Sequence, residues 1–208
     1  LQAAKSSYWE HIESVEEYLR ARRIPAYLGT RVHNYYEYLW DRHKGLNEQG
    51  LLQDLPESMR LDIMLHLARD VLEHVPMFRA CSPALRNTLL MALKPATFAP
   101  GNLLVREGEV GKSIVFITRG KAEIIAGQEE KVYGTLGPGD YFGYLSLTLK
   151  EPRSVSVRAL EYCEALILDK ADYDVISAEY PEFRDVMRTV SAQQSERASA
   201  LLLEGVVL

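Results

Sequence analysis

The sequence predicts an α+β fold in which an all-helical N-terminal part precedes an antiparallel β-roll of the jelly-roll or double-stranded β-helix type, flanked by helices. Two observations predict it. The first 76 of the 208 residues show only helical periodicity. Beyond them, short β-branched runs alternate with glycines, a pattern typical of small antiparallel sheets. We therefore expect two domains, residues 1–76 and residues 77–208.

Two helices are expected before Gly45. The first is expected to begin at Ser7, because Ser7 and Glu10 have capping-box spacing. Pro25 interrupts the periodicity and suits the first turn of a second helix, which should end near Gly45. The aromatic residues of the second helix are interpreted as a packing face, and they are Tyr35, Tyr36, Tyr38 and Trp40.

A third helix is expected from Asp54-Leu-Pro-Glu57 to Val71, and a fourth over Pro83–Lys94. The glycine-punctuated region follows. Its expected strands are Lys94–Ala99, Leu103–Arg106, Ser113–Thr118, Lys121–Ala126, Lys131–Leu136, Ser154–Leu160 and Cys163–Leu168. Helical periodicity returns at Ala171, and a last helix is expected over Pro181–Leu203, so that the roll and its flanking helices form one domain.

Composition narrows the classes of function. The net charge of −5 argues against a nucleic acid or an anionic membrane surface as the main partner. The two cysteines and five histidines show no metal-ligand spacing, so we predict no metal site. No nucleophile or P-loop motif occurs, which favours a protein that is not an enzyme. The chain opens on Leu1 rather than Met, which we interpret as the start of a fragment of a longer protein.

The segment Asp140–Arg158 has the layout of a pocket for one cyclic phosphate diester. A strand is expected to end at Phe142-Gly143, a short apolar helix follows, and Arg153-Ser154 return on the next strand. A buried monoanion requires backbone N–H donors from a helix N-terminus and one fixed guanidinium. This segment can supply both.

On these residues the chain resembles, over essentially its whole length, the C-linker and cyclic nucleotide-binding domain of hyperpolarisation-activated and cyclic nucleotide-gated cation channels, including their prokaryotic potassium-channel relatives. The motifs that carry the resemblance in the roll are Phe98–Gly101, Val105–Gly108, Gly111–Gly120, Gly137–Gly143 and Pro152–Ala159. Those in the helical part, which resembles the C-linker, are Val15–Leu19, Leu28–Tyr38 and Leu55–Arg60.

The resemblance implies a role for each residue of the nucleotide site. Gly143, Leu145 and Ser146 would offer backbone donors to the cyclic phosphate, and Arg153 would be its charge partner. Ser154 would touch the phosphate and, for a guanine base in syn, the exocyclic amine, so both cAMP and cGMP remain candidate ligands. The residues implied to line the roll around ribose and base are Ile125, Leu136 and Phe142, and those implied to close over the base from the last helix are Arg197, Ala198 and Leu201.

One position departs from the family pattern. The family commonly places a glutamate directly after Phe-Gly, where its carboxylate accepts the ribose 2′-hydroxyl, and this chain has Tyr144. Losing a charged acceptor removes on the order of 1.5 to 3 kcal/mol, which would lower nucleotide affinity roughly tenfold to a hundredfold. Tyr144 is nevertheless kept among the expected contacts of the nucleotide.

The resemblance also implies a function for the whole chain. It would be the ligand-sensing and gating region of a cyclic nucleotide-regulated cation channel, selective for potassium, on the cytoplasmic face of the cell membrane. It would need no cofactor besides its ligand, would form a homotetramer through the C-linker, and would follow an upstream transmembrane pore. Two alternatives stay open: a ligand-blind tetramerisation module of a related channel, and a soluble cAMP sensor.

Overall fold

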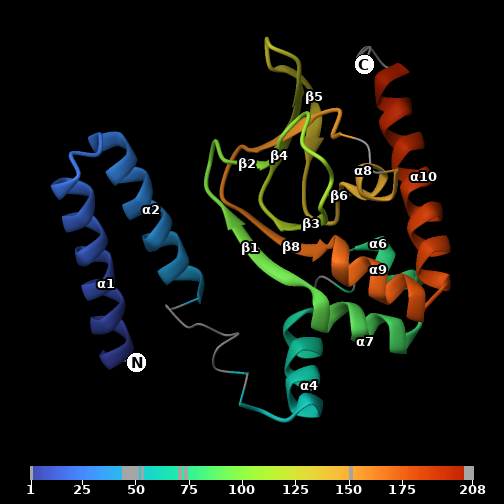
Figure 1. Ribbon diagram of the computed structural model, residues 1–208, viewed down its shortest axis with the longest axis horizontal. Helices are drawn as coiled ribbons and strands as arrows, with labels where there is room; N and C mark the ends of the chain where they lie inside the picture. Colours follow the sequence, from blue (N-terminus) through green and yellow to red (C-terminus); the bar gives the residue numbers. More distant parts are fainter. Residues whose placement is uncertain are drawn as a thin grey trace. The chain divides into compact units, whose positions relative to one another are not determined.

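The computed structural model describes residues 2–43, 52, 54–69, 72, 75–149 and 152–203 (Figure 1). The chain forms two compact units, Leu1–Arg60 and Leu61–Leu208. The functional division expected between residues 76 and 77 stays a prediction. Among the described residues, no helix combines the length and the apolar character that crossing a membrane would need.

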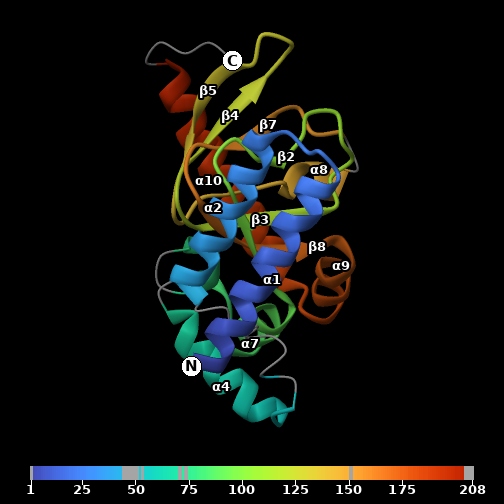
Figure 2. The ribbon, with the colours of Figure 1, turned by 90° about the vertical axis from the view of Figure 1, so that its left-hand side faces the viewer.

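The smaller unit contains a helical hairpin of α1 (Gln2–Ala21) and α2 (Ala26–His43), which lie side by side in Figures 1 and 2. Its contacts are mostly aromatic. The Tyr8 hydroxyl donates a hydrogen bond of 2.8 Å to the carbonyl of Tyr36, and the Tyr8 and Trp40 rings lie 5.1 Å apart. Ile12 on α1 is buried. The predicted aromatic packing face is confirmed for Tyr36 and Trp40.

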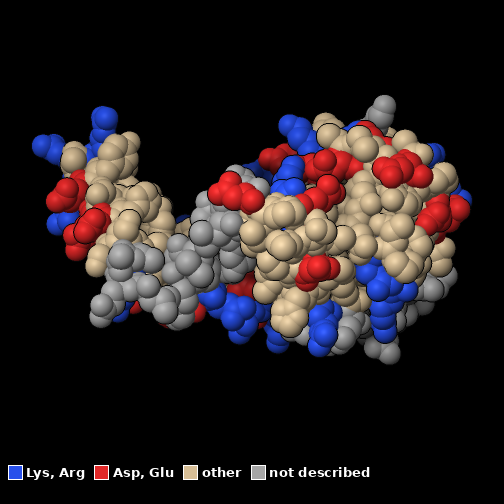
Figure 3. All heavy atoms as spheres, turned by 90° about the horizontal axis from the view of Figure 1, so that it is seen from below, with Lys and Arg blue, Asp and Glu red and all other residues tan. Residues whose placement is uncertain are grey.

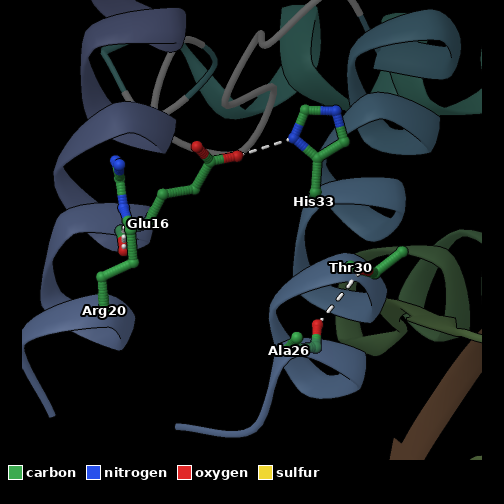
Figure 4. A network of polar contacts seen from close by, with 5 residues as sticks. All are labelled: Glu16, Arg20, Ala26, Thr30 and His33. Carbon is green, nitrogen blue, oxygen red and sulfur yellow. Dashed lines mark hydrogen bonds and ion pairs between the residues drawn. The ribbon is translucent and has the colours of Figure 1, made fainter. Parts of the chain in front are cut away.

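A polar contact joins the other end of the hairpin. His33 Nδ1 on α2 lies 2.7 Å from Glu16 Oε1 on α1, and Figure 4 shows the two side chains pointing toward each other. Both side chains are more than one third exposed, so solvent screens this pair and its contribution to stability is small. The predicted capping box at Ser7 is wrong, because α1 already begins at Gln2 and Ser7 lies inside the helix.

The larger unit is built on two four-stranded antiparallel sheets, with strand orders β1-β8-β3-β6 and β2-β7-β4-β5. The strands are β1 (Lys94–Phe98), β2 (Leu103–Val105), β3 (Ser113–Arg119), β4 (Ala122–Ala126), β5 (Lys131–Leu136), β6 (Tyr141–Phe142), β7 (Ser156–Ala159) and β8 (Cys163–Asp169). This arrangement, with helices before and after it, confirms the predicted α+β fold with a β-roll.

Six helices of the described chain lie before, within or after the roll. They are α4 (Glu57–Leu67), α6 (Pro76–Ala80), α7 (Pro83–Ala92), α8 (Tyr144–Leu149), α9 (Lys170–Glu179) and α10 (Glu182–Leu203). The third predicted helix is shorter than expected, because α4 ends at Leu67, and Val71 lies outside the described residues. The small helix α6 was not expected as a separate element.

Two apolar cores hold this unit together. One fills the space between the two sheets and includes Val115, Ile117 and Val157. The other joins α6, α7, α9 and α10 to the outer side of the first sheet, and its fully buried residues include Phe78 and Phe116, whose ring centroids are 5.8 Å apart. Strands β3 and β6 contribute residues to both cores. The segment between β6 and β7 therefore lies at the border between the roll and the helices.

Candidate functional site

Gly143 is the joint between strand β6 and helix α8. Its φ of +98° lies in the region that only glycine adopts without strain. A Cβ atom at this position would lie 2.6 Å from the carbonyl oxygen of Ser113 and 2.8 Å from Nη1 of Arg153. The backbone of Gly143 therefore packs directly against the Arg153 guanidinium, and the two residues form the centre of the candidate site.

Arg153 is buried, with 8% of its surface exposed, although it carries a positive charge. Its Nη2 donates a hydrogen bond of 3.0 Å to the carbonyl of Ser113 on β3. Its backbone is fixed on both sides, because its N–H donates to Glu109 and its carbonyl accepts from Gly108, at 2.9 and 2.8 Å. The loop between β2 and β3 thus holds this arginine in place.

The guanidinium of Arg153 lacks a carboxylate partner among the described residues: no ion pair between them includes it. Burial lowers the pKa of Arg153, and the charge of Glu109 acts in the opposite direction. An arginine keeps its proton under all ordinary conditions. The site therefore holds a desolvated positive charge with donors left over, which favours a bound anion.

Helix α8 is packed tightly against the same loop. Its first turn closes on Gly143, whose carbonyl accepts from the N–H of Leu147 at 3.1 Å and from the hydroxyl of Ser146 at 3.2 Å. A Cβ atom on Gly111 would lie 2.5 Å from the Ser146 hydroxyl, so the loop backbone touches the helix. The N–H groups of a first helical turn have no acceptor within the helix, and here they lie beside Gly143. Leu145 is 61% exposed on this helix.

The three apolar residues expected around the nucleotide come from neighbouring strands. Leu136 on β5 and Phe142 on β6 both contact the core between the two sheets. Ile125 on β4 is 3% exposed and pairs in register with Ser156 on β7. Leu136 and Phe142 thus face the inside of the roll, and Ile125 is buried on a strand that pairs with β7.

Tyr144 packs toward the helices. It lies against the helical core, and its ring is 6.3 Å from that of Tyr173 on α9 in an edge-on arrangement. Burial, together with the neighbouring Tyr173, raises the pKa of Tyr144 to about 12. Its phenol is thus neutral and engaged with α9, and its expected contact with a nucleotide stays a prediction.

The two serines after Arg153 have different surroundings. Ser154 is exposed in a bend, because Pro152 pairs with Val110 and the strand β7 begins only at Ser156. Ser156 is buried, and its hydroxyl accepts a hydrogen bond of 2.8 Å from the N–H of Glu107. Sequence reasoning missed Ser156, although its place in an alternating strand three residues after Arg153 was a usable signal.

The residues expected to cover the base belong to α10. Arg197, Ala198 and Leu201 lie within the bounds of this helix, but their side chains lie outside the described residues. Earlier in α10, the hydroxyls of Ser191 and Tyr141 are 3.2 Å apart, which ties the helix to β6 directly before Gly143. The structure thus brings Gly143, Ser146 and Arg153 together, and places the apolar residues on adjacent strands.

Comparison with known proteins identifies this arrangement. A family model described as "Cyclic nucleotide-binding domain" matches residues 95–180, which contain Gly143, Ser146 and Arg153. Residues 95–180 belong to the cyclic nucleotide-binding domain family. This match confirms the cyclic nucleotide-binding domain predicted from the sequence motifs.

Curated relatives extend the similarity beyond this domain. The chain is 28% identical to "Cyclic nucleotide-gated channel alpha-3" of Homo sapiens, over 93% of this chain and 29% of that protein. It is 31% identical to "Potassium/sodium hyperpolarization-activated cyclic nucleotide-gated channel 3" of Mus musculus, over 95% of this chain and 25% of that protein. A "Cyclic nucleotide-gated cation channel" of Ictalurus punctatus is 27% identical over 99% of this chain. The chain spans less than a third of the length of these relatives.

Proposed function

We propose that this chain is the ligand-sensing and gating region of a cyclic nucleotide-regulated cation channel, and that it binds cAMP or cGMP at Arg153. The observation that carries the proposal is the desolvated guanidinium of Arg153, which has no carboxylate partner in the described chain and contacts the backbone of Gly143. Its position within residues 95–180, in the cyclic nucleotide-binding domain, supports the same reading.

A cyclic phosphate diester fits this centre chemically, because it carries one negative charge on two oxygens that can each accept several hydrogen bonds. The fork of a guanidinium has five N–H donors, and the carbonyl of Ser113 uses one nitrogen. The remaining donors of Arg153 can contact the phosphate, together with the N–H groups that begin α8. We assign these backbone donors to Gly143, Leu145 and Ser146.

The ribose and base would lie along the inner side of the roll, against Ile125, Leu136 and Phe142. Their burial and their position on β4, β5 and β6 support this assignment. Ser154 is exposed beside Arg153, so its hydroxyl is available to a ligand without breaking a contact within the protein. A preference for cGMP would come from this hydroxyl and the guanine amine. Tyr144 would contact the ligand only after leaving Tyr173.

Ligand binding would act by shifting a population. In the proposed mechanism, the bound nucleotide favours a state in which α10 closes over the base through Arg197, Ala198 and Leu201. The bond between Tyr141 on β6 and Ser191 on α10 supports a link between the phosphate segment and this helix. We further propose that the first helices assemble as a homotetramer on the cytoplasmic side of a membrane, behind a potassium-selective pore, and that the chain has no catalytic activity.

The first experiment is a calorimetric titration of the whole chain with cAMP and then with cGMP. Replacing Arg153 by Ala should weaken binding about tenfold to a hundredfold, the loss expected for hydrogen bonds to a charged group. Arg158→Ala is the matched control on the same segment, because Arg158 already pairs with Glu123 and Glu130. Its nucleotide affinity should stay within about twofold of the parent.

Two results would overturn the proposal. One is the absence of saturable binding of either nucleotide to a folded sample, which would leave a ligand-blind assembly module as the surviving function. The other is an equal loss of affinity in Arg153→Ala and Arg158→Ala, since the effect would then not come from the phosphate contact.

A further inference from the structure

A second basic site lies among the helices of the larger unit. A surface hollow of about 560 Å³ is lined by Leu65 near the end of α4, Arg69 and Leu72 beyond it, Arg79 on α6 and Arg86 on α7. Three of its five lining residues are therefore arginines. None of the five belongs to the strands, loop or helix that carry Gly143 and Arg153, so this hollow is separate from the proposed nucleotide site.

The walls of the hollow are held by the helical core. Met77 and Phe78 on α6 are fully buried, and so is Leu85 in the first turn of α7. Leu65 and Leu72 also pack partly against this core. The backbone positions of Arg79 and Arg86 are thus fixed by apolar packing, while Arg69 and Arg79 are themselves exposed.

Within the described chain, no ion pair includes any of these three guanidinium groups. Nη2 of Arg86 donates to the carbonyl of Cys81 at 3.2 Å, while its Nε is buried without a hydrogen-bond partner. The nearby carboxylate of Glu182 instead accepts from the hydroxyl of Ser82, at 2.8 Å.

The hollow carries a local excess of positive charge, whereas the chain as a whole is acidic, with 29 carboxylates and 24 Lys and Arg side chains. Figure 3 shows the face on the side of α4 and α7, where basic groups gather along the lower edge of the larger unit and most acidic groups lie across its upper half. Like charges around one hollow repel one another unless an anion lies between them.

We propose that this hollow binds a multivalent phosphate, meaning a phosphomonoester or pyrophosphate group with at least two negative charges. Arginine forks match phosphate oxygens in pairs, and three of them around one hollow suit a more highly charged group than a cyclic diester, which carries a single charge. Leu65 and Leu72 provide an apolar wall for the carbon part of such a ligand. The group can belong to a free metabolite or to a phospholipid headgroup.

The test is a calorimetric titration of the whole chain with inorganic pyrophosphate, in an Arg153→Ala background so that the nucleotide site does not contribute. Arg69→Gln and Arg79→Gln should each weaken binding about threefold or more, and the double variant about tenfold or more. Both side chains are exposed, so the variants should fold. Arg119→Gln, an exposed arginine at the end of β3, is the control and should change the affinity less than about twofold.

A second arm separates the two sources of the phosphate. Vesicles of phosphatidylcholine with phosphatidic acid should retain the chain, and lose it in the double variant, if the site accepts a headgroup. If only free pyrophosphate binds, the ligand is a soluble metabolite. Binding of the vesicles and binding of pyrophosphate alone both support the site. The proposal is overturned if the folded chain binds neither pyrophosphate nor the vesicles, or if Arg119→Gln weakens binding as much as the double variant.

Discussion

Replacing Gly143 by Ala tests the centre of the site most directly, because two separate costs can be worked out. The first is conformational: a φ of +98° costs a residue with a Cβ atom about 1–2 kcal/mol. The second is steric, since the new methyl group would lie 2.6 Å from the Ser113 carbonyl and 2.8 Å from Arg153 Nη1. Losing the hydrogen bond from Arg153 Nη2 to the Ser113 carbonyl costs about 1.5–3 kcal/mol. The expected loss of stability is therefore about 2.5–5 kcal/mol.

Gly127→Ala is the matched control. Gly127 has a φ of +77°, but nothing lies within 4 Å of the position of its Cβ atom. This variant should lose only the conformational part, about 1–2 kcal/mol. The difference between the two variants, about 1.5–3 kcal/mol, isolates the contact with Arg153 and Ser113.

The assay is amide hydrogen exchange of the β3 and β7 peptides, because it reports the opening of the roll separately from the helical hairpin. The expected difference corresponds to protection that is about tenfold to a hundredfold lower in Gly143→Ala than in Gly127→Ala. Equal protection in the two variants would refute the close packing of the Gly143 backbone on the guanidinium.

Three further outcomes are expected. Ser156→Ala should destabilise the roll by about 0.5–1.5 kcal/mol in urea unfolding, because the part-buried N–H of Glu107 loses its acceptor. Ser154→Ala should stay within about 0.5 kcal/mol and alter only the cGMP-to-cAMP affinity ratio. The pKa of Tyr144 is raised from 10.0 to about 12, so between these values the folded state keeps a proton that the unfolded chain loses. Stability therefore falls as pH rises through this range. In alkaline thermal melts, Tyr144→Phe should lose less stability over this range than the parent chain does. Tyr8→Phe removes the bond to the Tyr36 carbonyl and should lower the protection of hairpin amides by about 0.5–1.5 kcal/mol; unchanged protection would contradict that bond.

The strands of the roll were predictable because glycine turns and β-branched runs are local signals. The expected strand Lys131–Leu136 coincides with β5, and the others differ by one or two residues at their ends. The strand that contains Arg158 was predicted to begin too early, at Ser154, because the pairing of Pro152 with Val110 depends on a loop more than forty residues away in the sequence. Such a long-range pairing leaves no trace in a local pattern.

The positive charge of the site was predictable from the sequence, whereas the contacts of Arg153 and Tyr144 with other parts of the chain were not. The binding position of Arg153 was predictable from its place between Pro152 and a hydrophobic strand. Its role as the charge partner of a phosphate was implied by the family resemblance. The Ser113 carbonyl is a backbone atom and carries no side-chain signal, so its bond to Arg153 could not be foreseen. The position of Tyr144 against Tyr173 likewise depends on how α9 folds back on the roll. The helix start at Gln2 shows that capping-box spacing also occurs within helices.

The aromatic cluster of the hairpin has an optical consequence. Both tryptophans of the chain, Trp9 and Trp40, are in α1 and α2, with ring centroids 6.3 Å apart, while the larger unit absorbs only through tyrosine and phenylalanine. Selectively excited tryptophan emission is thus an intrinsic reporter of the hairpin alone. A change in that emission when a nucleotide binds at Arg153 would show, without any label, that the signal reaches the helices that precede the sensor.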